Sequence, residues 1–156
     1  MKKLIAMLLI LVCVLTMVGC NNTKQTETTY TFRGEHDYFE ISNGTIVLSD
    51  TDELFDGGDL HITQSDVLNN IVSYSTTFYT IIDGERRTIL SNSVIDQTGS
   101  AINVEGDLGK SSGKGVIIGS KVENIDELKD NLWFEIETTD LDGKENVYQI
   151  QLTFSN

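Results

Sequence analysis

Apolar and polar residues alternate along much of the chain. In the segment 148–154 every second residue is apolar, namely Tyr148, Ile150, Leu152 and Phe154. A period of two is typical of a β-strand with one buried face and one face in water. The segment 133–137 alternates in the same way, with Phe134 and Ile136 expected inside, and an Asp-Gly pair at 142–143 separates the two segments. The sequence therefore predicts a C-terminal β-hairpin.

A second hairpin is predicted around Asp83-Gly84, a pair that two-residue type I′ turns favour. Its strands are expected at 72–82 and 87–90. Pairing the residues beside the turn places Phe78 opposite Ile89, which is a favourable cross-strand pair. Because the first strand is long, we also expect it to bend or bulge near residues 75–77.

The remaining apolar segments complete an all-β pattern of about eight strands. Further short strands are expected at 30–32, 38–41, 45–48 and 116–118, with a turn at Asn43-Gly44. Strands joined by glycine-rich turns predict a single antiparallel β-sandwich, with a small β-barrel as the alternative. The segment 125–132 is expected to be either one short helix capped by Asn124 or a crossover loop.

Residues 1–19 differ from the rest of the chain. Lys2 and Lys3 are followed by an apolar run from Leu4 to Val18. A short basic start before such a run is typical of an export signal. As a helix the run would span roughly 22 Å, which is short for a bilayer core of about 30 Å. We therefore expect a cleaved signal rather than a retained transmembrane anchor.

The end of the apolar run carries a more specific motif. Met17-Val18-Gly19-Cys20 resembles the lipobox of bacterial lipoproteins, although that family usually has Leu at the position of Met17. The resemblance implies cleavage between Gly19 and Cys20. It also implies that the thiol of Cys20 carries a diacylglyceryl group, whose fatty acids (palmitate, for example) hold the protein in the membrane. Two acyl chains give stable anchoring where one would be marginal. Cys13, inside the run, is expected to act as a small hydrophobic residue.

These motifs divide the chain into three predicted parts. They are a lipoprotein signal peptide at 1–19, a polar tether with the lipidated Cys20 at 20–29, and the β-sandwich domain at 30–156. Eight extended residues reach about 26 Å, so the domain is expected close to the extracytoplasmic face of the cell membrane. No cysteine follows Cys20, which leaves the domain without a disulfide.

Short segments of the domain extend the resemblance. The sequences FRGE, NGTIV, TTFYTIIDGE and GKENVYQIQL look like those of a group of small uncharacterised lipoproteins from low-GC Gram-positive bacteria. The likeness covers most of residues 30–154. It implies a location and a type of domain, and it brings no activity with it.

The densest acidic segment is 50–59, which holds five carboxylates. Carboxylate oxygens are the ligands that Ca²⁺ takes, and the weak candidates are Asp50, Asp52, Asp56 and Asp59. The glycines of this segment come too late for an EF-hand loop. A solvated acidic loop with a glycine turn is therefore the favoured interpretation.

Two other motifs fall short of a catalytic pattern. Gly109-Lys110-Ser111 ends like a P-loop, but Val104 stands where the first glycine is required and no helix is predicted to follow. We expect a surface loop there.

His36 and His61 are the only histidines, and no serine lies in a G-x-S-x-G motif. Each histidine is expected on a strand surface.

Glu135 and Glu137 share one face of a predicted strand, about 7 Å apart. Paired carboxylates at such a distance are used in glycoside hydrolysis, but the ordinary solvated face of a strand is the favoured interpretation. Trp133 lies on the same face. An exposed tryptophan is a candidate recognition residue for sugar or protein. The alternatives are a loop that covers it, or a role in capping one end of the sandwich.

The charge of the chain excludes several partners. Eleven basic residues stand against 24 acidic ones, a net charge of −13, and removal of the two lysines at the N-terminus would make it −15. Such a charge repels nucleic acid and anionic lipid headgroups. Without a catalytic or cofactor motif, we expect a non-enzymatic surface lipoprotein that binds an unknown protein or cell-wall glycan. The alternatives are an envelope hydrolase that uses His36 or His61, and a calcium-stabilised surface domain.

Overall fold

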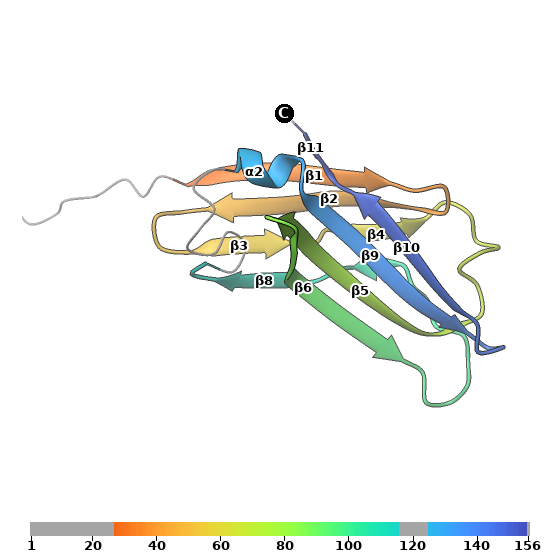
Figure 1. Ribbon diagram of the computed structural model, residues 1–156. Coiled ribbons are helices and arrows are strands. Elements are labelled where there is room, and N and C mark those ends of the chain that lie inside the picture. Colours follow the sequence, from red (N-terminus) through yellow and green to blue (C-terminus); the bar gives the residue numbers. More distant parts are fainter. Residues whose placement is uncertain (1–26, 116–124, 156) are drawn as a thin grey trace, which may run out of the picture.

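Alternating apolar residues build two antiparallel sheets whose apolar faces pack against each other (Figure 1). The computed structural model describes residues 27–115 and 125–155, and these residues contain eleven strands and one short helix. The predicted all-β sandwich is confirmed, with more and shorter strands than the eight expected. The strands divide into two separate sheets, so the sandwich forms and not the barrel.

The larger sheet has seven strands in the described part of the chain. Its main order is β11-β1-β2-β3-β8, and β4 pairs with both β2 and β7. The strands are β1 (Thr28–Glu35), β2 (Phe39–Leu48), β3 (Glu53–Asp56), β4 (Asp59–Ile62), β7 (Gly106–Asp107), β8 (Lys110–Gly113) and β11 (Thr153–Ser155).

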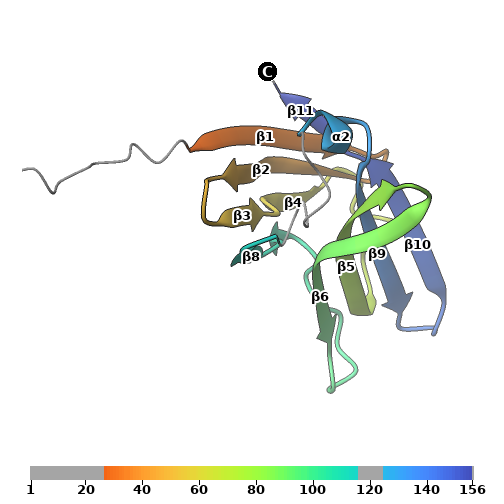
Figure 2. The same ribbon diagram turned by 60° about the vertical axis from the view of Figure 1, so that its left-hand side comes forward.

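The smaller sheet has the order β10-β9-β5-β6. Its strands are β5 (Ile71–Ile82), β6 (Glu85–Ile95), β9 (Leu132–Asp140) and β10 (Glu145–Gln151). Both predicted hairpins are present, since β5 pairs with β6 and β9 with β10. At the β5–β6 turn, Asp83 and Gly84 have φ of 54° and 77°, the positive values that a type I′ turn requires. Figure 2 shows no other described strand or helix over the outer face of this sheet.

The core between the sheets is rich in phenylalanine. Phe78 of β5 packs against Phe55 of β3 and Phe134 of β9, with ring centroids 5.0 Å apart in each pair. Phe32 stacks on Phe55 at 5.4 Å and continues the cluster toward β1. Phe134 and Ile136 are fully buried, as the alternation predicts. Each ring pair adds about 0.5–1.5 kcal/mol to the stabilisation from buried area.

The turn predicted at Asn43-Gly44 is wrong, because both residues lie inside the single strand β2. Asn43 has a φ of 60°, and the register between β1 and β2 shifts at this point. The result is a β-bulge rather than a chain reversal. Gly44 lies beside the ring of Phe32, where a Cβ atom would overlap the ring. The two halves of β2 on either side of the bulge pair with different strands, β4 and β3.

A bulge also changes the predicted register of the β5–β6 hairpin. Next to the turn the pairing is as expected, but Phe78 pairs with Leu90 and not with Ile89. Ile89 is the extra residue of β6, and it is buried. The bulge therefore lets β6 direct this side chain toward the core. The irregularity lies in β6, whereas the prediction put it at residues 75–77 of the preceding strand.

The alternating segment 148–154 is two strands rather than one. β10 belongs to the smaller sheet and β11 to the larger one. Leu152 between them is fully buried, and its N–H donates to the carbonyl of Leu132 at 2.9 Å. The chain thus crosses between the sheets along one side of the sandwich. On the other side, the amide of Asn92 in β6 donates to the carbonyl of Leu108 at 2.6 Å and bridges the gap.

The helix predicted at 125–132 is limited to one turn, α2 (Asp126–Lys129). Its residue Leu128 is fully buried in the core. The predicted cap Asn124 and the predicted strand at 116–118 lie outside the described residues. Among the described residues, the structure contains no helix with the length and apolarity that a membrane span requires.

Candidate binding face

The outer face of the four-stranded sheet gathers polar and aromatic side chains. Because side chains alternate between the two faces of a strand, residues paired across strands point to the same side. The rows of this face that matter for the site are Tyr79 with Trp133, Thr77 with Glu135 and Gln149, and Ser75 with Glu137. This surface is called the outer face below.

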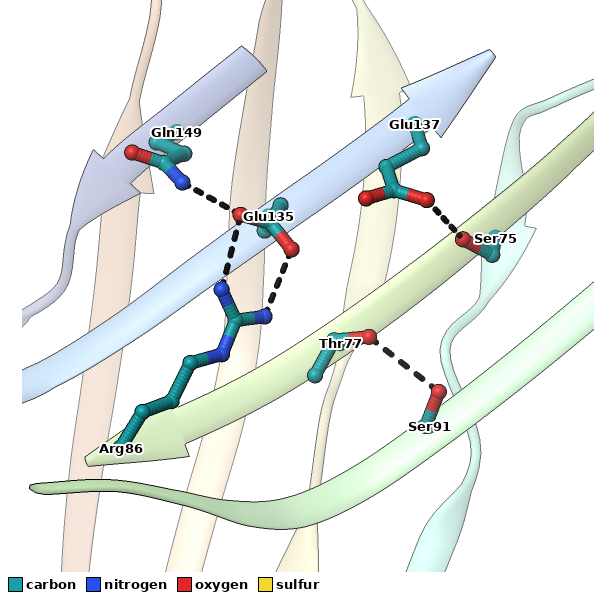
Figure 3. Close-up of polar contacts among 7 residues, drawn as sticks. All are labelled: Ser75, Thr77, Arg86, Ser91, Glu135, Glu137 and Gln149. Carbon is teal, nitrogen blue, oxygen red and sulfur yellow. Dashed lines mark hydrogen bonds and ion pairs between the residues drawn. The ribbon is translucent and has the colours of Figure 1, made fainter. Parts of the chain in front are cut away.

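At the centre of the outer face, Arg86, Glu135 and Gln149 form one hydrogen-bonded network (Figure 3). Arg86 donates from Nη2 to Oε1 of Glu135 at 2.6 Å and from Nη1 to Oε2 at 3.0 Å. The side-chain amide of Gln149 also donates to Oε2. A bidentate arginine–carboxylate pair is stronger and more directional than a single ionic hydrogen bond. Donors from β6 and β10 therefore meet on the carboxylate of β9.

Glu135 is buried although it points away from the phenylalanine core. Only 7% of the residue is exposed, so the prediction of an ordinary solvated strand face is wrong at this position. The hydrogen bonds from Arg86 lower the pKa of Glu135 and outweigh burial, which acts in the opposite direction. Hydrogen bonding to Glu135 in turn raises the pKa of Arg86. Both groups are therefore charged at neutral pH.

Arg86 also covers Tyr79. Its guanidinium carbon lies 3.7 Å from the centroid of the tyrosine ring, which is a cation–π contact. Tyr79 is 3% exposed, and burial raises the pKa of its hydroxyl. Trp133 pairs with Tyr79 across the sheet and is half-buried, so it is exposed only in part. The ring of Tyr79 and the carboxylate of Glu135 together hold the long side chain of Arg86 in one position.

Hydroxyl groups lie on the outer face next to this network. The hydroxyl of Ser75 donates to Oε2 of Glu137 at 3.4 Å, and Thr77 and Ser91 share a hydrogen bond of 3.2 Å (Figure 3). Beyond them lies an open cleft of about 300 Å³. Its polar lining includes Ser73, Ser75, Ser93, Glu137, Thr139 and Glu145.

The two histidines do not line this cleft. The predicted place of His36 on a strand surface is wrong, because His36 lies in the β1–β2 connection, is half-buried and stacks on Phe39 with ring centroids 4.8 Å apart. Its ring also contacts Tyr148, and its Nδ1 accepts a hydrogen bond from the N–H of Tyr38 at 3.3 Å. His61 is exposed on β4, as predicted. The hydrogen bond that His36 accepts thus comes from the backbone of Tyr38 and not from a serine or a carboxylate.

The four acidic residues considered as weak calcium ligands have separate surroundings. Asp56 pairs with the ammonium of Lys110 at 2.6 Å, and Asp59 accepts a hydrogen bond from Asn43 at 3.0 Å. Within the residues that the structure describes, no three acidic, histidine or cysteine side chains form a group suited to a metal ion. The segment 50–59 is also not a single loop, because β3 and the start of β4 lie in it.

The segment that ends like a P-loop is an edge strand. β8 begins at Lys110 and pairs with β3, so the surface loop expected there is wrong from Lys110 onward. The hydrogen bond to Asp56 raises the pKa of Lys110. This ammonium group thus forms an ion pair with the neighbouring strand β3 and is not free to bind a phosphate.

The protein is thus an all-β sandwich, and the ion pair between Arg86 and Glu135 joins strands on the polar outer face of its smaller sheet. No family model matches the chain, and no curated protein or solved structure shows significant similarity to it. The predicted signal peptide, Cys20 and most of the tether lie outside the described residues.

Arg86 is the residue of this face that the sequence did not reveal as important. It pairs with Ile81 across the hairpin, and its contact with Glu135 runs diagonally over β5 and joins positions 49 residues apart. The sequence contains one indication of this position, which is the register that the two-residue turn sets for the hairpin. Because Ile82 and Glu85 flank the turn, Arg86 must share a face with Tyr79 and not with Phe78.

Proposed function

We propose that this protein is a lipid-anchored lipoprotein on the extracytoplasmic face of a bacterial cell membrane. We propose further that it binds a protein or a cell-wall glycan on its outer face without catalysing a reaction. The observation that carries the binding proposal is the Arg86–Glu135–Gln149 network, which fixes polar groups beside Trp133.

The anchor is supported by the sequence of Met17-Val18-Gly19-Cys20. Glu27, the first described residue, follows Cys20 by seven positions, and an extended chain of that length spans at most about 25 Å. With a net charge of −13, the protein is repelled by anionic headgroups, so charge does not attach it to a membrane and the proposed covalent lipid supplies the attachment.

The binding face is supported by its preorganisation. Arginine carries five N–H donors, and Arg86 uses two of them on Glu135. A ligand can reach Arg86, because 43% of its side chain is exposed. Side chains that are ordered before binding lose less entropy when a ligand arrives. Trp133 adds apolar area of the kind that dominates binding energy in interfaces.

The pKa of Glu135 argues for binding over glycoside hydrolysis. A general acid of that reaction needs a carboxyl whose pKa is raised so that it stays protonated near neutral pH. The contact with Arg86 lowers the pKa of Glu135 instead. The pair Glu135 and Glu137 therefore supports charge-based recognition better than proton transfer.

The proposal is tested in cells that produce the full-length chain as wild type, Cys20→Ala, Cys13→Ala or Trp133→Ala. Cells are treated with a membrane-impermeant crosslinker, fractionated, and analysed for the mass of the protein and for crosslinked species. We expect wild type and Cys13→Ala in the membrane fraction with a diacylglyceryl group. Cys20→Ala should leave the membrane or keep its signal peptide. Trp133→Ala should stay in the membrane and lose the crosslinked species.

Two results contradict the proposal. An unmodified Cys20 in wild-type protein would overturn the anchor. Crosslinked species that persist in Trp133→Ala, with the melting temperature of the domain unchanged, would overturn the assignment of the binding face.

A further inference from the structure

The cleft on the outer face has its own chemistry. Its lining residues lie where β6 and β9 end and β5 and β10 begin. These strand ends are at the end of the sandwich away from the start of β1 (Figures 1 and 2). Because the proposed anchor precedes β1, this end of the protein is the one farther from the point of attachment. A ligand in the surrounding envelope therefore reaches the cleft without approaching the lipid.

The charges of the cleft are all negative. Glu137 and Glu145 line it, and no lysine or arginine is among the described residues that line it. Glu137 accepts a long hydrogen bond from Ser75, at 3.4 Å, and it attracts Arg86 only at longer range, because the guanidinium is paired with Glu135. Unlike Glu135, neither carboxylate of the cleft forms an ion pair within the described part of the chain.

The two carboxylates are placed to bind one cation together. Val147 pairs with Glu137, and Glu145 precedes it by two residues on β10, so the two glutamates are diagonal neighbours. Diagonal positions on antiparallel strands lie about 7–8 Å apart, a span that a single ammonium or guanidinium group can bridge. The hydroxyls of Ser73 and Thr139, in the adjoining row of the sheet, offer further acceptors.

Apolar side chains stand at both edges of the cleft. Ile95 of β6 is 70% exposed and Val147 of β10 is 57% exposed. They offer contact area to the aliphatic part of a ligand, as the stem of a lysine or a neighbouring apolar residue provides.

We infer that this cleft binds a basic, extended segment of a partner protein, with a lysine or arginine head between Glu137 and Glu145 and aliphatic groups against Ile95 and Val147. The inference rests on the proposed function, because it assigns the ligand class of the same face. Charge complementarity decides the class: an anionic polymer is repelled by the cleft and by the whole chain, which carries −13. A neutral glycan leaves both carboxylates without a counter-charge.

The test measures binding of fluorescein-labelled hexalysine to the full-length chain in a non-ionic detergent by fluorescence anisotropy. The double variant Glu137→Gln, Glu145→Gln is compared with Glu35→Gln, Glu40→Gln. The control removes two carboxylates that are also paired across neighbouring strands, but on the larger sheet. We expect the cleft variant to bind about five- to tenfold more weakly, as for the loss of two partly exposed ion pairs, and the control to bind like wild type.

Several outcomes overturn the inference. One is equal weakening of hexalysine binding in both double variants. Another is the absence of hexalysine binding to wild type near about 0.15 M salt, where the Debye length is about 8 Å. The third is displacement of the peptide by a neutral chitohexaose. Melting temperatures show whether each variant is folded. Because this assay needs neither membrane nor envelope, its failure leaves the fractionation result for Cys20 unaffected, and the two proposals can fail separately.

Discussion

Replacing Arg86 with leucine is expected to destabilise the protein in a pH-dependent way. Leucine keeps an apolar side chain over Tyr79 but removes both hydrogen bonds to Glu135. The carboxylate of Glu135 then remains buried with Gln149 as its donor. Breaking a fully buried ion pair by removing one partner costs about 3–5 kcal/mol. Because the side chain of Arg86 is 43% exposed and that of Glu135 only 8%, we expect about 2 kcal/mol at pH 7.

The sign of the pH dependence follows from the pKa of Glu135. In wild type, Arg86 lowers this pKa in the folded state, so the pair contributes stability above the unfolded pKa and loses it as the pH falls through the folded value. In Arg86→Leu, burial of the carboxyl raises the folded pKa, and the hydrogen bond from Gln149, which is the weaker effect, opposes it only in part. The variant therefore loses stability as the pH rises. The difference between the two proteins is largest near neutral pH and narrows below about pH 5.

Urea denaturation followed by the fluorescence of Trp133, the single tryptophan, measures the effect. With a slope of about 1–3 kcal/mol per molar urea, a loss of about 2 kcal/mol moves the midpoint by about 1 M. Arg87→Leu is the matched control, since its contact with Glu85 is 3.7 Å long and exposed, and it should change stability by less than about 0.5 kcal/mol. A loss in Arg86→Leu that is the same at pH 7 and pH 4 would refute the reasoning and assign the effect to packing on Tyr79.

Two further substitutions test the core. Thr138→Val removes a fully buried hydroxyl that has no hydrogen-bond partner in the described part of the chain, so we expect a melting temperature higher by about 3 °C, and a decrease would contradict this. Gly44→Ala should cost about 1–3 kcal/mol, because the new Cβ overlaps the ring of Phe32. The double variant with Phe32→Leu should lose less than the sum of the two single changes, as urea midpoints would show, and strict additivity would count against the overlap.

The inward-facing residues of the strands could be predicted because the period of two is a local property. Once Phe134 and Ile136 are assigned to one face, burial of that face follows from the apolar area alone, and both are buried. The type I′ turn at Asp83-Gly84 was equally local, since it depends on the positive φ that these two residues tolerate. Features that depend only on neighbouring residues could thus be predicted from the sequence.

Features that depend on strands far apart in the sequence could not be predicted. An Asn-Gly pair favours positive φ in a turn and in a bulge alike, and only the pairing of β2 with β1 decides that Asn43 forms a bulge. Likewise, alternation through Leu152 continues without interruption while the chain passes from one sheet to the other. The hydrogen bond from Leu152 to Leu132 that marks this crossing joins two strands whose relative position the sequence does not reveal.

In the candidate site, too, the sequence predicted the local feature and missed the contact between distant strands. Alternation placed Glu135 and Glu137 on one face, but it assigned them the same surroundings, because it contains no information about what reaches over from β6. Arg86 forms an ion pair with Glu135, while Glu137, one row farther, accepts a hydrogen bond from Ser75 and attracts Arg86 only at longer range. A carboxylate that is paired with its own arginine stabilises the sheet, and a carboxylate without an ion pair is left for a ligand. The proposed binding of a basic segment therefore depends on the reach of one arginine side chain, which covers the first glutamate and stops short of the second.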